Sequence, residues 1–283
     1  MFADDSKLFR VINDNNDRRL LQSDLLAVCS WSRTWLMELN VKKCKFMHFA
    51  TPNTNPILSY YMEEYDLTGN LSKVQLDHST SERDLGIQIT SDLKNREQVN
   101  LAAAKANRIL GQFKKAFTSR NPSLWKRLYT TYVRPPLEFA IQAWSPHLAA
   151  DIKVLEQIQR KATRIPHDLK RFGYETRCRK LGLTTLRERR VRGDLIQHFK
   201  FEKGFDTIQW YHPPQRGQSR RIRLHRELVK NCNSRFHWFN NRLVGSWNAL
   251  PDEVTSVTSV SQFKSRLANV GNLLELNPLR LAR

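Results

Sequence analysis

The feature that most constrains the fold is a change in hydrophobic pattern near residue 96 of the 283-residue chain. Before it, short apolar runs mostly lie between turn-forming residues, a pattern typical of strands. After it, apolar residues recur at intervals of three and four with basic residues between them, a pattern typical of helices. The sequence therefore predicts an α+β chain, with mixed structure over residues 1–95 and a mainly helical remainder.

Within the first region, apolar residues at helical spacing predict one helix from Asp17 to about Leu39. A turn is expected at Gly69-Asn70. Strands are expected over Val41–Phe49, Ile57–Met62, Lys73–Leu76 and Leu85–Ile89. In the second region, helices are expected over Gln98–Phe117, Ser123–Tyr132, Asp151–Ile165 and Leu186–Phe201.

The rest of the second region changes in composition. Pro135-Pro136 interrupts the second helix, because proline lacks the amide hydrogen that a helix needs. In residues 204–234, Pro213-Pro214 leads into five arginines, and the segment is expected to form a basic linker with little core. Residues 235–283 are expected to form a small C-terminal module. The predicted divisions are therefore 1–95, 96–203, 204–234 and 235–283.

Charge is distributed as unevenly as the hydrophobic pattern. The chain has 47 basic and 27 acidic side chains, a formal net charge of +20. Residues 1–95 hold 11 basic and 13 acidic side chains, whereas the remainder holds 36 and 14, a net of +22. Such a positive field attracts polyanions, and nucleic acid is the first candidate because phosphate contacts release counterions. An anionic membrane surface and a basic surface without a dedicated partner stay open as alternatives.

Other classes of protein are disfavoured by what the sequence lacks. The four cysteines show no metal-ligand spacing and predict reduced thiols: Cys29, Cys44, Cys178 and Cys232. No apolar run approaches the roughly 20 residues that a membrane span needs. The first residues lack the pattern of a secretory signal. We therefore expect an intracellular protein of the nucleus or cytoplasm, not secreted and without a membrane partner.

The clearest candidate for chemistry is the acidic turn Phe2-Ala3-Asp4-Asp5. Paired aspartates are common in solvated turns, so an inert turn is the alternative interpretation. Carboxylate oxygens at the tip of a rigid hairpin are also suitable ligands for magnesium. The choice between the two interpretations depends on the segments further along the chain.

Several later segments give this turn a context. The Phe-Ala-Asp-Asp sequence resembles the metal-binding hairpin of the reverse transcriptase palm, and Arg83–Thr90 is similar to the "DLGV" segment that grips the primer end. Cys29–Cys44 looks like the helix and strand between them, and Trp247–Pro251 also fits. Three segments resemble the thumb region, namely Ala104–Gly111, Tyr132–Ala140 and Trp144–Arg164, and Arg189–Ile196 fits too. In this order they are similar to the reverse transcriptases of jockey- and CR1-type non-LTR retrotransposons.

The resemblance implies an RNA-directed DNA polymerase, a nucleotidyltransferase of a mobile element. It implies a partial palm with primer-grip-like strands over residues 1–95 and a helical thumb over residues 96–203. Asp4 would be a direct ligand of Mg²⁺ or Mn²⁺ and Asp5 the supporting carboxylate. The partners would be an RNA template and a DNA primer.

The resemblance also sets a limit on activity. In that family the fingers and a third metal-binding aspartate precede the Phe-Ala-Asp-Asp turn, where this sequence has only Met1, Phe2 and Ala3. We therefore expect a truncated polymerase that is inactive alone, unless a separate polypeptide supplies the N-terminal half. The first dozen residues are expected to be poorly ordered, because part of their sheet would be missing.

The positions expected to contact nucleic acid lie on the primer-grip-like strand and on two basic helices. They are Leu85 and Gly86, then Lys105, Arg108, Lys114 and Lys115, then Arg187, Arg189, Arg190 and Arg192. Thumb contacts of this kind go to phosphates and not to base edges. Each basic cluster has a solvated helix face as its alternative. The arginines of residues 216–226 fit either phosphate binding or a disordered linker.

Two other interpretations of the whole chain stay open. One is a non-enzymatic, basic nucleic-acid-binding protein derived from the element, in which the acidic turn is inert. The other is a decayed gene product without a selected role. The tryptophans, among them Trp31, Trp35, Trp144 and Trp247, are expected to pack in cores or interfaces and not to stack on bases.

Overall fold

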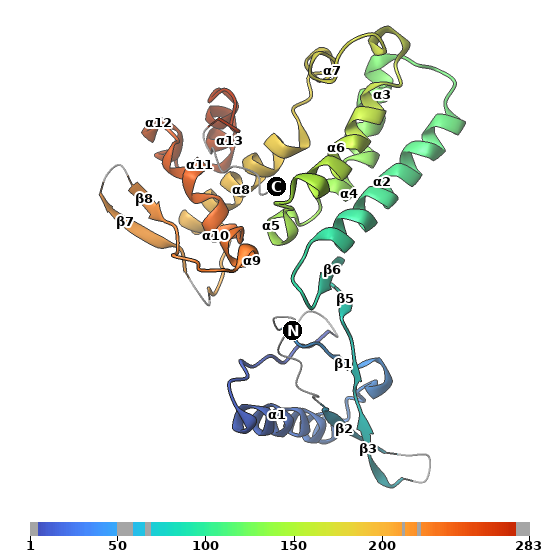
Figure 1. Ribbon diagram of the computed structural model, residues 1–283, viewed down its shortest axis with the longest axis vertical. Coiled ribbons are helices and arrows are strands. Elements are labelled where there is room, and N and C mark those ends of the chain that lie inside the picture. The colour runs from blue at the N-terminus through green and yellow to red at the C-terminus, as the bar shows by residue number, and fades with distance from the viewer. Residues whose placement is uncertain (1–4, 50–58, 66–68, 211–212, 220–221, 276–283) are drawn as a thin grey trace. The chain divides into compact units, whose positions relative to one another are not determined.

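The computed structural model describes residues 5–49, 59–65, 69–210, 213–219 and 222–275. It combines many helices with small two-stranded sheets, so the α+β prediction is confirmed (Figure 1). Two compact units divide the chain. Unit 1 comprises residues 1–83 and 90–93, and unit 2 comprises residues 84–89 and 94–283. The division lies close to the change of sequence pattern near residue 96.

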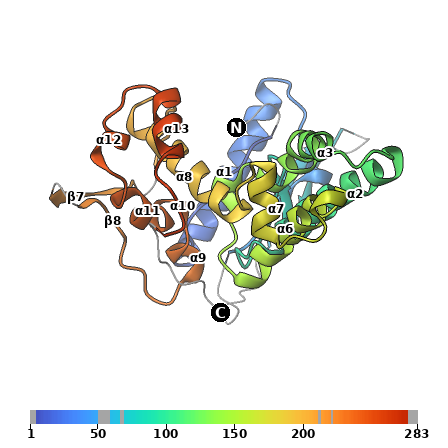
Figure 2. The same cartoon turned by 90° about the horizontal axis from the view of Figure 1, so that it is seen from above.

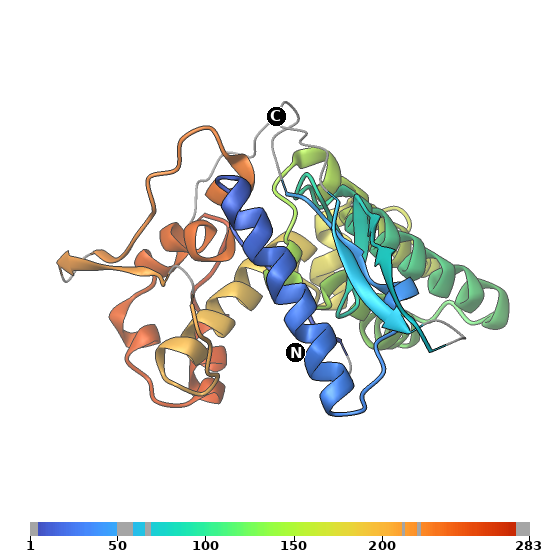
Figure 3. The same ribbon diagram turned by 90° about the horizontal axis from the view of Figure 1, so that it is seen from below.

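Unit 1 is organised around one long helix, α1, which runs from Asn15 to Thr34 without a break (Figure 3). Its first turn is capped by Asp14, whose carboxylate accepts a hydrogen bond from the Asp17 amide at 2.9 Å. A short 3₁₀ turn and small strands come after it: η1 (Val41–Lys43), β1 (Lys45–Phe46), β2 (Tyr61–Tyr65), β3 (Leu71–Gln75), β4 (Asp77–His78), β5 (Ser81–Asp84) and β6 (Ile87–Thr90).

The strands pair in twos and do not form one continuous sheet. β2 and β3 are antiparallel, with Tyr61 opposite Gln75 and Tyr65 opposite Leu71. β1 and β4 are parallel over two residues. The helix α1 packs beside β2, where the Gln22 amide donates to the Tyr61 carbonyl at 2.8 Å and accepts from the Tyr61 amide at 3.1 Å. The Gln22 side chain thus forms hydrogen bonds with both the amide and the carbonyl of Tyr61 on β2.

The core of unit 1 is small. Five buried side chains form it: Cys29, Val41, Tyr60, Met62 and Leu76. The helix predicted to reach Leu39 ends at Thr34 instead, and Leu36 adopts a positive φ of 54° just beyond it. Trp31 and Trp35 are 46% and 67% exposed, so they do not pack in the core of unit 1. Their alternative role, packing in an interface, stays a prediction.

Unit 2 is mainly helical. Its first part contains α2 (Arg96–Ala116), α3 (Pro122–Leu128), a π-helical turn η2 (Tyr129–Val133), α4 (Pro135–Glu138), α5 (Ile141–Trp144), α6 (Ala149–Thr163), η3 (His167–Leu169), α7 (Tyr174–Leu181) and α8 (Leu186–Glu202). Its second part contains β7 (Gln215–Ser219), β8 (Ile222–His225), α9 (Asn233–Phe236), α10 (Phe239–Arg242), α11 (Val244–Asn248), α12 (Asp252–Thr255) and α13 (Val260–Ala268).

The first part of unit 2 packs α2 against α6, with α3 and α7 beside α6 (Figure 2). The apolar positions that helical spacing gives for α2 are Leu101, Ala104, Ile109, Leu110 and Phe113. Leu110 is buried and Ile109 and Phe113 pack against the core, but Leu101 is 50% exposed and Ala104 is also exposed. The alanines Ala102, Ala103 and Ala106 are buried instead. Their small side chains suit a close approach between helices.

The second part of unit 2 does not behave as a separate linker and module. Leu195 and Phe199 of α8 share one hydrophobic core with Leu224, Trp247 and Phe263. The rings of Phe199 and Phe263 stack with centroids 4.2 Å apart. The divisions predicted at residues 203 and 234 are therefore corrected, because α8 needs the C-terminal elements to cover its apolar side.

No helix in the described ranges combines the length and the apolar character needed to cross a membrane.

Candidate nucleic-acid interface

The residues expected to bind metal are only partly described. Asp4 lies outside the described residues, and Asp5 is exposed. Among the residues that the structure describes, no three or more His, Cys, Asp or Glu side chains come together as a potential metal site. The metal site thus stays a prediction from the resemblance.

The primer-grip-like residues form the tip of a hairpin. Leu85 and Gly86 have φ angles of 45° and 87° and link β5 to β6, as in the two-residue turns that favour glycine. The expected strand therefore begins at Ile87 and not at Leu85. A Cβ atom added to Gly86 would lie 3.2 Å from Cε1 of Phe139. Leu85 is half-exposed, so this turn presents one apolar side chain to its surroundings.

The basic residues of α2 fall on two sides of the helix. Lys105, Arg108 and Lys115 are exposed and spaced by three and seven residues, which places them in one row. That row lies opposite the buried alanines. Lys114 is also exposed but points to another side, where a groove lies next to the helix end. The sequence thus identified one exposed basic row correctly as a surface feature.

A groove with five basic side chains lies where α2 and α6 end. We call it the basic groove; its lining consists of Lys114, Arg120, Lys161, Arg164, Ile165 and Lys170. Its volume is about 490 Å³. Lys114 belongs to the last turn of α2 and Lys161 to the last turn of α6. The packing of these two helices brings charges together that are far apart in sequence.

The electrostatics of the basic groove favour an anion. No acidic residue lines it in the part of the chain that the structure describes. Cations near helix C-termini offset the helix dipole, which explains one basic residue at each end but not five around one space. Arg120 is oriented by the Ser119 carbonyl, to which Nη1 donates at 3.2 Å, and lies over the Trp125 ring at 5.5 Å. The groove is therefore suited to a strand of phosphates passing over it.

The sequence predicts that the arginines of α8 contact the phosphates of nucleic acid. Arg190, however, is only 4% exposed. Arg189 donates to both carboxylate oxygens of Glu138, through Nη2 at 2.9 Å and through Nε. Arg192 donates to the Lys264 carbonyl at 2.8 Å. These groups turn inward because α5, α6, α11 and α13 all pack around α8.

The arginine-rich segment near residue 220 is not free either. Arg223 donates to the carbonyls of Trp247 and Leu250, at 3.2 and 2.9 Å, and also pairs with Asp252. Arg226 donates to the Asn241 carbonyl at 3.2 Å. Arg220 and Arg221 lie outside the described residues. The described part of the segment thus holds β8 against α11 and α10, and it is not an extended linker.

Comparison of the chain with family models, with curated proteins and with solved structures finds no match. The candidate interface therefore depends on its own geometry. Sequence reasoning did not single out Arg120, Lys161, Arg164 and Lys170 as site residues. Lys161 and Arg164 belong to a run of basic residues at the end of a predicted helix, which was the one hint in the sequence. The spacing of residues along the chain does not relate that run to Lys114.

Proposed function

We propose that this chain is part of a reverse transcriptase of a non-LTR retrotransposon, and that unit 2 binds the nucleic-acid duplex as a thumb. The observation that carries the binding role is the basic groove, with five cationic side chains and no acidic one. The order of the motifs along the chain supports the family. The parent reaction would be RNA-directed DNA synthesis with Asp4 and Asp5 at the metals.

The proposed binding is independent of base sequence. Lysine and arginine on the surface of packed helices contact phosphates, and such contacts position a duplex without reading its bases. The basic groove would take one backbone, and the row of Lys105, Arg108 and Lys115 offers further contacts along α2. The Leu85-Gly86 turn, which belongs to the same unit, would meet the primer end.

The test is the salt dependence of binding by the full chain to an RNA–DNA duplex. Removing one phosphate contact lowers the slope of log K against log salt by about 0.9 for B-form DNA, and by a similar amount for this duplex. The double variant Lys161→Ala, Arg164→Ala should therefore reduce the slope by about 2. Fluorescence anisotropy at several salt concentrations measures it.

A matched control uses two exposed lysines of unit 1. The double variant Lys42→Ala, Lys43→Ala removes the same formal charge from the other unit and should leave the slope unchanged. An equal reduction in both variants would mean that net charge alone drives binding. A slope near zero in the unmodified chain would contradict the thumb proposal altogether.

A second candidate is a non-enzymatic nucleic-acid-binding protein. The basic groove favours it equally, because phosphate binding there needs neither Asp4 nor Asp5. Primer extension on an RNA template with Mg²⁺ or Mn²⁺ separates the candidates. Incorporation that disappears in the Asp4→Ala, Asp5→Ala variant would establish a working polymerase. Duplex binding without incorporation is the result that we expect for these 283 residues alone.

A further inference from the structure

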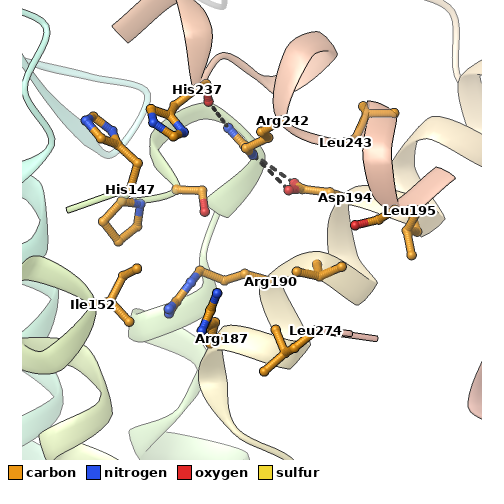
Figure 4. A pocket seen from close by; sticks show the side chains of 14 residues that line it. His147, Ile152, Arg187, Arg190, Asp194, Leu195, His237, Arg242, Leu243 and Leu274 are labelled. Atoms are coloured by element: carbon orange, nitrogen blue, oxygen red, sulfur yellow. Dashed lines mark hydrogen bonds and ion pairs between the residues drawn. The ribbon is translucent and has the colours of Figure 1, made fainter. Parts of the chain in front are cut away.

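A second pocket lies in unit 2, between the start of α8, the α5–α6 loop and α10 (Figure 4). Its volume is about 100 Å³. One water needs about 10–15 Å³ of such space, so the pocket has room for a small polyatomic ion. The polar side chains that line it include Arg187, Arg190, His147 and His237. None of them lines the basic groove.

Arg190 is the unusual group in this pocket. It is 4% exposed, and its two terminal nitrogens, Nη1 and Nη2, are buried without a hydrogen-bond partner among the described residues. Burial lowers the pKa of its guanidinium to about 10, so the group still carries its charge at neutral pH. A buried charge without hydrogen bonds is costly, and most native proteins provide it with a partner. Two vacant donors therefore point to a missing acceptor.

A second cation points into the same space. In Figure 4, the Arg187 side chain lies next to that of Arg190, between Ile152 and Leu274. Arg187 also lowers the pKa of Arg190, as expected for two like charges at close range. An anion between the two guanidinium groups would remove their repulsion and accept their hydrogen bonds.

The rest of the lining supplies neutral donors and no free carboxylate. Asp194 is already bound by Arg242, whose Nε and Nη2 donate to its two oxygens at 2.8 and 2.9 Å. His147 and His237 stack with ring centroids 4.3 Å apart. Burial lowers the pKa of both rings, that of His237 to about 4, so both are neutral at pH 7. A neutral imidazole can still donate one N–H to an oxyanion.

We propose that Arg187 and Arg190 bind a phosphate group in this pocket, either free phosphate or the terminal monoester of a nucleotide. Two guanidinium groups match a doubly charged oxyanion, because arginine donates in a planar fork that fits phosphate oxygens. The small volume admits the phosphate but not a base, so a nucleoside would lie outside the pocket. This site goes beyond the proposed thumb function and does not depend on it.

The competing explanation is an internal partner for Arg190. The best candidate is Glu156, whose Oε2 is also buried without a hydrogen bond to any described residue and whose charge opposes the lowering of the Arg190 pKa more strongly than that of any other carboxylate. A bridging water could join the two groups. In that case Arg190 would have a structural role only, and phosphate would have no vacant donors to occupy.

The experiment is isothermal titration of the full chain with inorganic phosphate, with ionic strength held constant by chloride. We expect saturable binding, and dissociation constants about tenfold or more higher in the Arg190→Met and Arg187→Met variants. Arg187 is only partly buried, so its variant remains informative if Arg190→Met fails to fold. A nucleoside 5′-monophosphate is titrated in the same way: tighter binding than that of inorganic phosphate identifies the nucleotide monoester as the source, and weaker binding identifies free phosphate.

The control removes a positive charge that lines neither the pocket nor the basic groove. The exposed Arg179→Met variant should bind phosphate as the unmodified chain does. Absence of saturable binding would overturn the proposal, as would unchanged binding in both Arg187→Met and Arg190→Met.

Discussion

The two units of this chain differ in how completely they bury their apolar residues. Among the residues that the structure describes, unit 1 has one core cluster of five buried side chains, whereas unit 2 has two much larger clusters. Unit 1 also leaves Phe9, Trp35 and Leu36 exposed by 87%, 67% and 91%. Exposed apolar surface of this kind often marks a contact with another partner or domain. The difference indicates that unit 2 buries its apolar side chains in cores of its own, while unit 1 leaves several large apolar side chains exposed.

The same comparison holds for charge. The excess of basic over acidic residues lies entirely after residue 95. The basic groove and the phosphate-sized pocket both belong to unit 2. Under the proposed function, unit 1 would need the remaining strands of a palm to complete its sheet. Unit 2 would bind the nucleic-acid duplex without them.

The largest expected effect comes from two tryptophans that test this comparison directly. Trp247 is 1% exposed, and its ring packs edge-on against His198 and near Phe263. Trp247→Ala should lower the free energy of unfolding of unit 2 by about 3–5 kcal/mol, because it opens a cavity in the core. Trp35→Ala should change the stability of unit 1 by no more than about 0.5 kcal/mol. Denaturant unfolding followed by circular dichroism measures both.

If Trp35→Ala cost as much as Trp247→Ala, unit 1 would have a core that its exposed side chains do not indicate. The comparison between the two units would then fail. A gain in solubility for the Trp35→Ala variant would instead support the difference in burial between the two units, because that variant removes an exposed apolar side chain.

The next effect is a loss of stability in acid that originates in unit 2. His198 is 5% exposed, and burial lowers its pKa from 6.5 to about 4, with a smaller contribution from Arg216. Glu202 lies 3.8 Å from Nε2, too far for a hydrogen bond, and it is partly exposed, so burial dominates. The unfolded chain therefore binds the proton more readily than the folded chain between these two pKa values.

Stability should accordingly be complete above about pH 6.5 and should fall as the pH drops toward 4. The shift corresponds to about 3 kcal/mol at most. His198→Leu should flatten this part of the profile of unfolding free energy against pH. His237, whose pKa is also about 4, would account for a remaining slope. If the His198→Leu variant had the same profile as the unmodified chain, folding would not lower the pKa of His198.

The sequence predicted the class of fold because periodicity is a local property. The strands around Gly69-Asn70 and the long helices of unit 2 lie near their predicted positions. Trp144 and Trp247 are buried as predicted, at 2% and 1% exposure. The face that each helix buries was harder to predict. On α2, the leucine at 101 suggested the core, but close helix packing selected the alanines.

The candidate sites were less predictable, because they depend on tertiary packing. Arg189 and Arg190 have the sequence pattern of exposed basic residues, yet Glu138 and the C-terminal elements surround α8. The basic groove joins residues about 50 positions apart in sequence, such as Lys114 and Lys161. Only the row of Lys105, Arg108 and Lys115 could be inferred from helical spacing alone.

A smaller effect should come from the buried amide of Gln159 in unit 2. Its Oε1 accepts from the Tyr129 hydroxyl at 2.6 Å, and its Nε2 donates to the Tyr174 hydroxyl at 2.8 Å and to the Thr184 carbonyl at 2.9 Å. Gln159→Met keeps the volume but removes these three hydrogen bonds, which should cost about 1–3 kcal/mol, although the Tyr174 hydroxyl keeps its bond to Glu156. Adding Tyr129→Phe should recover part of the loss in a double-mutant cycle. Simple additivity of the two changes would contradict the network.

The smallest effect should come from Gln22 in unit 1. Like Gln159, it forms several hydrogen bonds through its side-chain amide, but it is less buried. Its amide bonds both backbone groups of Tyr61, and so it ties α1 to β2. Gln22→Ala should weaken only the local structure of unit 1, by about 1 kcal/mol, because partly buried hydrogen bonds contribute little net stability. Amide exchange at Tyr61 should then accelerate about fivefold, while amides in the core of unit 2 keep their rates. Faster exchange in unit 2 as well would mean that the two units unfold together, and the independence on which the comparison rests would be lost.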